Sequence, residues 1–116
     1  MVLNAAKMGL PFNGVVSFHG SLAGVNPNKD LLKAKILVCH GGDDKFISAQ
    51  EEAQFRKGLD SIEADYTFKT YAGATHAFSN PEATAIGKKF NLPISYNAAA
   101  DSASWQDMRT FFARIF

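Results

Sequence analysis

The 116-residue sequence has one cysteine, almost no net charge and no long apolar run. Because Cys39 has no partner in the chain, an internal disulfide is excluded, and we expect a cytoplasmic protein in a reducing compartment. The net charge is +1 and the densest basic run is Lys88-Lys89, so neither nucleic acid nor an anionic membrane is expected as a partner. No segment approaches the ~20 apolar residues of a membrane-spanning helix. Residues 1–7 lack the charged-then-apolar pattern of a secretion signal.

The remaining composition fits one folded domain. Hydrophobic residues make up 47% of the chain and charged residues 20%, which is typical of a globular protein. There is no internal repeat, no low-complexity tract and no linker that would divide the chain. We therefore expect residues 1–116 to form a single domain.

Three apolar segments predict strands, over residues 14–20, 34–41 and 66–71. The first two are continuous apolar runs without strict alternation, which is typical of strands that are covered on both faces. Helical patterns lie before and between these segments and at the end of the chain. Strands and helices that alternate in this way predict an α/β fold, with about three parallel strands flanked by helices.

The longer helices are predicted from apolar spacing and capping residues. Ser48-Ala49-Gln50-Glu51 is a capping-box pattern, and Phe55, Leu59 and Ile62 follow it on one face. A last helix is expected to begin near Ser102. Its predicted apolar face consists of Trp105, Met108, Phe112 and Ile115. Shorter helices are expected over residues 1–8 and 82–89.

Two polar residues follow the last two predicted strands. Asp44 comes after the second strand and a Gly-Gly turn, and His76 comes after the third strand and a run of small residues. The carboxyl ends of parallel strands meet at one rim of a sheet, so we expect the two side chains to lie close together. An acid followed by a histidine is the order found in the second half of an α/β-hydrolase triad. There the acid orients the histidine, which serves as the general base. No nucleophile elbow precedes the pair in this chain.

Other interpretations of these residues stay open. Asp44 taken alone fits equally well as a residue that bonds the following turn, and Asp43 competes with it for the role of the acid. His76 taken alone fits a histidine that bonds backbone at a loop edge. His19 and His40 also stand at predicted strand ends, so a zinc site made with Asp43 or Asp44 is conceivable. The short-range spacing of known metal motifs is absent.

The chain offers poor candidates for a nucleophile. Cys39 lies inside an apolar strand, where cysteines are usually buried and unreactive. Ser17 and Ser21 lack the glycines that flank a nucleophilic serine at a strand-to-helix turn.

A series of short motifs runs through the chain in a definite order. They are Val15-Val16-Ser17-Phe18-His19-Gly20, the segment 36–44, the segment 71–78, Asn80-Pro81, Tyr96-Asn97-Ala98-Ala99-Ala100-Asp101 and Ser104-Trp105. Together they resemble the dienelactone hydrolase family, which has the α/β-hydrolase fold. The resemblance covers essentially the whole chain.

The resemblance implies roles for particular residues. In that family the nucleophile, a cysteine or sometimes a serine, lies in a glycine-rich elbow just before a helix, and residues 1–8 resemble the end of that helix. Asp44 resembles the family's acid and His76 its base. Members specific for dienelactone carry an arginine four residues after the histidine, where this chain has Asn80. No cofactor and no metal is implied.

These observations lead to a functional expectation. We expect the C-terminal part of an α/β-hydrolase domain, which supplies Asp44 and His76 but no nucleophile and is inactive alone. The intact parent would hydrolyse a small-molecule ester or lactone through an acyl-enzyme. The alternative is a non-catalytic fragment or interaction domain, in which the Asp-His pair is a relic.

The first predicted strand also suggests an assembly. In the family fold it lies inside the sheet, so here it would become an edge with unpaired backbone groups and exposed apolar side chains. We expect a homodimer or larger homo-oligomer that covers Val15, Val16, Phe18 and the apolar side of residues 1–8. The alternative is a monomer in which the N-terminal segment or residues 79–100 fold over the edge.

Overall fold

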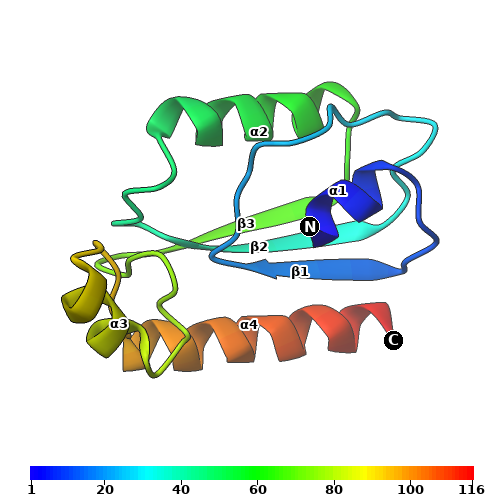
Figure 1. The fold of residues 1–116 in the computed structure, drawn as a ribbon. Helices are drawn as coiled ribbons and strands as arrows, with labels where there is room; N and C mark the ends of the chain where they lie inside the picture. The colour runs from blue at the N-terminus through cyan, green and yellow to red at the C-terminus, as the bar shows by residue number, and fades with distance from the viewer.

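The computed structural model describes all residues from 1 to 116. The elements in chain order are α1 (Val2–Lys7), β1 (Gly14–Phe18), β2 (Lys35–Gly41), α2 (Ala49–Ser61), β3 (Tyr66–Tyr71), α3 (Ala83–Phe90) and α4 (Ala98–Ile115). They form three layers, with α1 and α2 on one face of the sheet and α4 on the other (Figure 1). None of the helices is both long and apolar enough to cross a membrane.

The sheet has three parallel strands in the order β1-β2-β3. The register places Val16 beside Leu37 and Leu37 beside Thr67, so β2 is the central strand. All residues of β2 after Lys35 are buried, as expected for a strand that is covered on both faces. The predicted α/β architecture is confirmed.

Alternation along β2 divides the core in two. Ile36 and Val38 face α1 and α2 and pack with Phe55 and Leu59 of α2. Leu37 and Cys39 face the other way, in a second cluster that includes Phe111 of α4. The helices on the two faces therefore hold β2 rigidly, and they fix the place where its carboxyl end delivers the chain.

The predicted capping box at α2 forms only in part. The Oγ of Ser48 accepts a hydrogen bond from the backbone N–H of Glu51 at 3.0 Å, as the pattern predicts. The Glu51 carboxylate does not return to Ser48. It accepts instead from the backbone N–H of Leu22 at 3.3 Å, and so ties the β1–β2 connection to α2.

The start of α4 was predicted wrongly. The helix begins at Ala98, four residues before Ser102, because Asn97 caps it by accepting from the N–H of Ala100 at 3.0 Å. Its apolar face agrees with the prediction in part. Met108, Phe112 and Ile115 are partly buried and pack against the second core cluster, whereas Trp105 is 47% exposed. The buried residues of the helix are Ala100, Ser104 and Phe111. Small side chains let the first turns approach their neighbours closely, so the bulky residues lie towards the margins.

Candidate active site

Asp44 and His76 meet at the rim formed by the carboxyl ends of β2 and β3. Oδ2 of Asp44 lies 2.8 Å from Nδ1 of His76. A carboxylate oxygen can only accept a hydrogen bond, so this contact puts the proton of a neutral imidazole on Nδ1 and leaves Nε2 free to accept. The Asp44 side chain is 0% exposed and that of His76 is 32% exposed, so the acid is shielded while the histidine reaches solvent.

Local backbone geometry aims the Asp44 carboxylate. Its Oδ1 accepts from the backbone N–H of Phe46 at 2.8 Å, which leaves Oδ2 for the histidine. Asp44 thus bonds its own turn, as one interpretation of the sequence predicted, and also bonds His76. Asp43 is exposed, and its backbone N–H donates to the carbonyl of Ala74 at 2.8 Å. Only Asp44 of the two carboxylates contacts the histidine.

Gly41 allows the two strand ends to come together. A Cβ at this position would lie 2.5 Å from the carbonyl oxygen of Ala74 and 2.8 Å from that of Thr75. Both atoms belong to the backbone of the segment that leads to His76, so neither can move aside cheaply. The glycine is therefore needed for the close approach of the acid turn and the histidine loop.

The loop that carries His76 is fixed by polar contacts on its far side. Oγ1 of Thr75 accepts from the backbone N–H of Ser95 at 2.8 Å and donates towards its carbonyl oxygen at 3.1 Å. A parallel bridge pairs His76 with Ile94. Ala77 has a φ of 63°, a conformation that non-glycine residues rarely adopt without support. The segment 91–97 thus holds the loop of His76 in place. No pattern in the sequence predicted this support.

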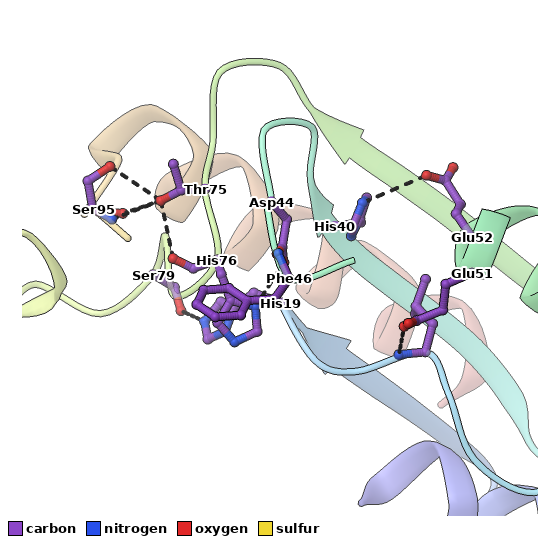
Figure 2. A network of polar contacts seen from close by, with 11 residues as sticks. His19, His40, Asp44, Phe46, Glu51, Glu52, Thr75, His76, Ser79 and Ser95 are labelled. Atoms are coloured by element: carbon purple, nitrogen blue, oxygen red, sulfur yellow. Dashed lines mark hydrogen bonds and ion pairs between the residues drawn. The ribbon is translucent and has the colours of Figure 1, made fainter. Parts of the chain in front are cut away.

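His19 is a second histidine at the site. Its ring centroid lies 5.7 Å from that of His76 in an edge arrangement, and its Nε2 lies 2.7 Å from Oγ of Ser79. Phe46 also contacts the His76 ring, with centroids 5.1 Å apart, and Figure 2 shows the three rings gathered at one place. Burial and the neighbouring His76 lower the pKa of His19. The His76 ring therefore stands between an aromatic ring and an imidazole that resists protonation.

His40 does not join this group, although its place at a predicted strand end had left open a site that combines it with His19 and Asp43 or Asp44. It points to the opposite side, where its Nε2 lies 3.7 Å from Glu52 of α2 and its ring contacts Phe68 (Figure 2). No three His, Cys, Asp or Glu side chains gather as metal ligands would. The zinc site considered from the sequence would have needed His19 and His40 together.

Cys39 lies in the core and away from the histidine. It is fully buried on the α4 side, and burial raises the pKa of its thiol. The hydroxyl of Tyr71 lies 3.5 Å from its sulfur and donates to Oδ2 of Asp107 at 2.7 Å. The bond between Tyr71 and Asp107 ties the end of β3 to α4, while burial favours the protonated thiol.

The motif Tyr96-Asn97 has a structural explanation. Asn97 caps α4 through its side chain, and its backbone N–H donates to the carbonyl of Phe78 at 3.0 Å. The hydroxyl of Tyr96 donates to Oδ2 of Asp101 at 2.7 Å. These contacts connect the start of α4 to the segment that follows His76. The motif therefore helps to position the histidine loop through backbone contacts.

The chain is similar to known proteins over part of their length. The chain is 30% identical over 104 residues to an uncharacterized protein of Caenorhabditis elegans, a match that covers 88% of this chain and 64% of that protein. It also superposes on the crystal structure of a dienelactone hydrolase-like promiscuous phosphotriesterase from metagenomic libraries, with a TM-score of 0.89 and 28% identity. That match covers 98% of this chain and 47% of the other.

The chain thus spans less than two thirds of the relatives that it matches. The model of the dienelactone hydrolase family matches the whole chain, residues 1–116. The fold agrees as well, with three parallel strands between layers of helices. The chain belongs to the dienelactone hydrolase family, a family of hydrolases with the α/β-hydrolase fold.

Proposed function

We propose that this chain is the C-terminal part of an α/β-hydrolase domain, in which Asp44 and His76 are the acid and the base of the catalytic triad. The observation that carries the proposal is the 2.8 Å contact between Oδ2 of Asp44 and Nδ1 of His76. It leaves Nε2, on a partly exposed ring, as the atom that takes a proton from the nucleophile. The reaction is hydrolysis of a carboxylic ester or lactone through an acyl-enzyme.

In the proposed reaction His76 acts first as base and then as acid. Nε2 takes the proton of a cysteine or serine as that group attacks the substrate carbonyl, and it returns the proton to the alkoxide that leaves. In the second half the same atom takes a proton from water as the water attacks the acyl group. It then returns that proton to the sulfur or oxygen of the nucleophile, which leaves as the carboxylic acid is released. Asp44 stays ionised throughout and stabilises the imidazolium.

The nucleophile is proposed to come from outside these 116 residues. No hydroxyl or thiol of the chain hydrogen-bonds to Nε2 of His76, and the bond of its ring is the one to Asp44. The hydroxyl of Ser79 bonds to His19 instead. Cys39 is fully buried in the core cluster that includes Phe111 of α4. We therefore predict that the purified chain does not hydrolyse nitrophenyl esters above the rate of a His76→Ala variant.

The triad is tested by supplying the missing half. The chain is joined to the part of the metagenomic hydrolase that precedes the matched region, and nitrophenyl ester turnover is measured. Asp44→Asn should lower kcat by about 10³–10⁴-fold, because the histidine loses its orientation and its charge partner. Asp43→Asn is the matched control and should leave kcat within about threefold, since surface substitutions have small effects.

Two outcomes would contradict the proposal. One is a chimera in which His76→Ala or Asp44→Asn retains full turnover. The other needs no chimera: by NMR the chain alone should show a low-field Nδ1 proton on His76 that is lost in Asp44→Asn and kept in Asp43→Asn. If the unchanged chain lacks this proton, the proposed hydrogen bond between Asp44 and His76 is wrong. A folded chimera that keeps this proton but never turns over would instead favour a non-catalytic interaction domain.

The substrate is proposed at the level of its class. The side chain of Asn80 is exposed and accepts from the backbone N–H of Glu82 at 3.0 Å, so this position offers no cation for a substrate carboxylate. Dienelactone itself is therefore not the substrate that we propose. Because one relative is described as a promiscuous phosphotriesterase, a nitrophenyl phosphotriester belongs in the same assay as a second substrate.

We also propose that copies of the chain associate through β1. This strand is the first in the sheet order, so its outer edge has no neighbouring strand. Val16 and Phe18 are half-buried, while Met1 and Met8 of the adjoining α1 region are exposed. Val15 was expected to contribute its side chain, but that side chain is buried against α1, so only its backbone is available.

A further inference from the structure

A cavity of about 230 Å³ lies on the α1 and α2 face of the molecule, away from the rim that carries His76. Its walls come from the end of α1, from residues 22–27 of the β1–β2 connection and from α2. Figure 1 shows this connection running from β1 across to the side of α2. For scale, a dry cavity of ~150 Å³ is large enough to bind benzene. The volume therefore suits a small organic ligand.

Contacts with α1 and α2 hold the wall of the cavity in place. The connection is held at two points, where Leu22 donates to the Glu51 carboxylate at 3.3 Å and Val25 donates to Oδ1 of Asn4 at 3.2 Å. Leu22 itself is buried in the core. Gly24 passes so close to Asn4 that a Cβ there would collide with its side chain. These contacts attach the β1–β2 connection to both α1 and α2. The cavity is therefore bounded by a connection that is held in place.

Lys7 is the unusual member of the lining. It is only 5% exposed, yet its ammonium makes no hydrogen bond and no ion pair in the chain. Its one electrostatic contact is the face of the Phe55 ring, with Nζ 5.1 Å from the centroid. Burial without a counter-charge lowers the pKa of this amine. Nζ is not among the fully buried polar atoms that lack a partner, so it keeps some access to solvent and a ligand carboxylate can reach it from the cavity. An ammonium that is held among apolar groups gains from an anion that pairs with it.

The other walls define the rest of the ligand. Leu22, Val25 and Phe55 supply apolar and aromatic surface beside the ammonium. Glu51 is the one carboxylate in the lining, and it already accepts from the N–H of Leu22. A fully charged, strongly hydrated ion such as inorganic phosphate would meet this carboxylate and the apolar wall. A small acid with an apolar body matches both the charge and the surface.

We propose that this cavity binds a small aromatic or aliphatic carboxylic acid, with the carboxylate on Nζ of Lys7 and the apolar body against Phe55. The site is separate from Asp44 and His76, and it does not depend on the proposed hydrolase activity. Binding forms an ion pair in a shielded place, where such a pair is stronger than at the surface.

The test titrates the 116-residue chain with sodium benzoate and follows backbone amide signals by NMR. Saturable shifts are expected at Lys7, Phe55 and residues 22–27, with a Kd on the order of 1 mM. Lys7→Met should weaken binding by roughly tenfold or more, since that is about 1.4 kcal/mol of lost interaction. Lys7→Arg keeps the charge and should stay within a few-fold of the unchanged chain. Lys33→Met removes an exposed lysine of the same connection and should change nothing.

Further ligands separate the possible sources of a signal. Benzyl alcohol has the same body without the charge and should bind at least about tenfold more weakly, whereas inorganic phosphate should give no saturable shift. Equal binding of the alcohol, equal binding by Lys7→Met, or shifts that never saturate would each overturn the proposal. If Lys7→Met fails to fold, the comparison of benzoate with benzyl alcohol on the unchanged chain decides the question.

Discussion

The imidazole of His76 owes its position to its neighbours. Asp44 fixes Nδ1, Phe46 contacts the ring on one side, and His19 contacts it on another. His19 is itself held by Ser79 and has a φ of 40°, a conformation that is strained for a residue with a side chain. Strain of this kind persists where surrounding contacts over-determine the backbone. His19 therefore belongs to the support of the histidine loop.

The pH dependence of stability tests this position of His19. Its pKa is lowered in the folded state, chiefly by burial and then by His76, from an ordinary value of 6.5. Between the lowered pKa and about 6.5 the unfolded chain binds more protons than the folded one, so stability falls as the pH falls through this window. One proton can account for at most about 1.4 kcal/mol per pH unit.

His19→Asn removes this titration while it keeps a polar side chain that tolerates a positive φ. Urea unfolding between pH 7.5 and pH 5 should show a shallower loss of stability for the variant than for the unchanged chain. Ser79→Ala is the companion variant, which keeps the imidazole but removes its partner. Parallel curves for His19→Asn and the unchanged chain would show that His19 is not shielded.

Some of these residue positions could be predicted from the sequence and some were missed. Asp44 and His76 were found because each follows a recognisable strand and parallel strands end at one rim. His40 was misplaced because it lies inside β2, where alternation puts it on the face of Ile36 and Val38. Counting by two from Ile36 would have sent it towards α2. The contact of His19 with Ser79 spans 60 residues, and no local pattern reports it.

At the scale of elements, the site depends on how closely two strand ends approach. The turn after β2 and the loop after β3 touch through backbone at Gly41, and the segment before α4 braces the loop from the other side. The strands were predictable from their apolar runs. The brace was not, because residues 91–97 form no regular element and Asn97 stands in a run of alanines with no apolar spacing. The cap was visible in the sequence only as a motif of the family.

Gly41→Ala tests the close approach of the turn after β2 to the loop after β3. The added Cβ would meet two carbonyl oxygens of the histidine loop, so the loop has to move. We expect a loss of about 1–3 kcal/mol in the free energy of unfolding, as for other overpacked sites. The low-field Nδ1 proton of His76 should weaken or vanish as well, because the loop carries His76 away from Asp44.

Gly73→Ala provides the matched control for this change. Gly73 has a φ of 75°, yet a Cβ there would meet nothing within 4 Å. That variant should lose about 1 kcal/mol through backbone strain while His76 keeps its Nδ1 proton. If both variants keep the proton, the approach at Gly41 does not control the site.

At the scale of the whole molecule, the two edges of the sheet differ in what surrounds them. On one side of β2, β3 leads into the histidine loop and is tied to α4 through Tyr71 and Asp107. β1 and β3 each have a free outer edge, because they are the first and last strands of the sheet. The exposed apolar residues Met8, Leu10 and Phe12 precede β1 in the chain. Free edges beside apolar surface are the usual sites of pairing between chains.

The proposed association predicts a mass above that of the monomer. Light scattering after gel filtration at micromolar concentration should give at least twice the chain mass of 12.6 kDa. Met8→Glu with Leu10→Glu puts charge beside the β1 edge and should shift the protein to monomer, since like charges across a symmetric interface repel. Phe90→Glu with Leu92→Glu changes equally exposed apolar residues at α3 and should leave the mass unchanged. A monomeric mass for the unchanged chain, or equal dissociation by both pairs of substitutions, would show that β1 is not the interface.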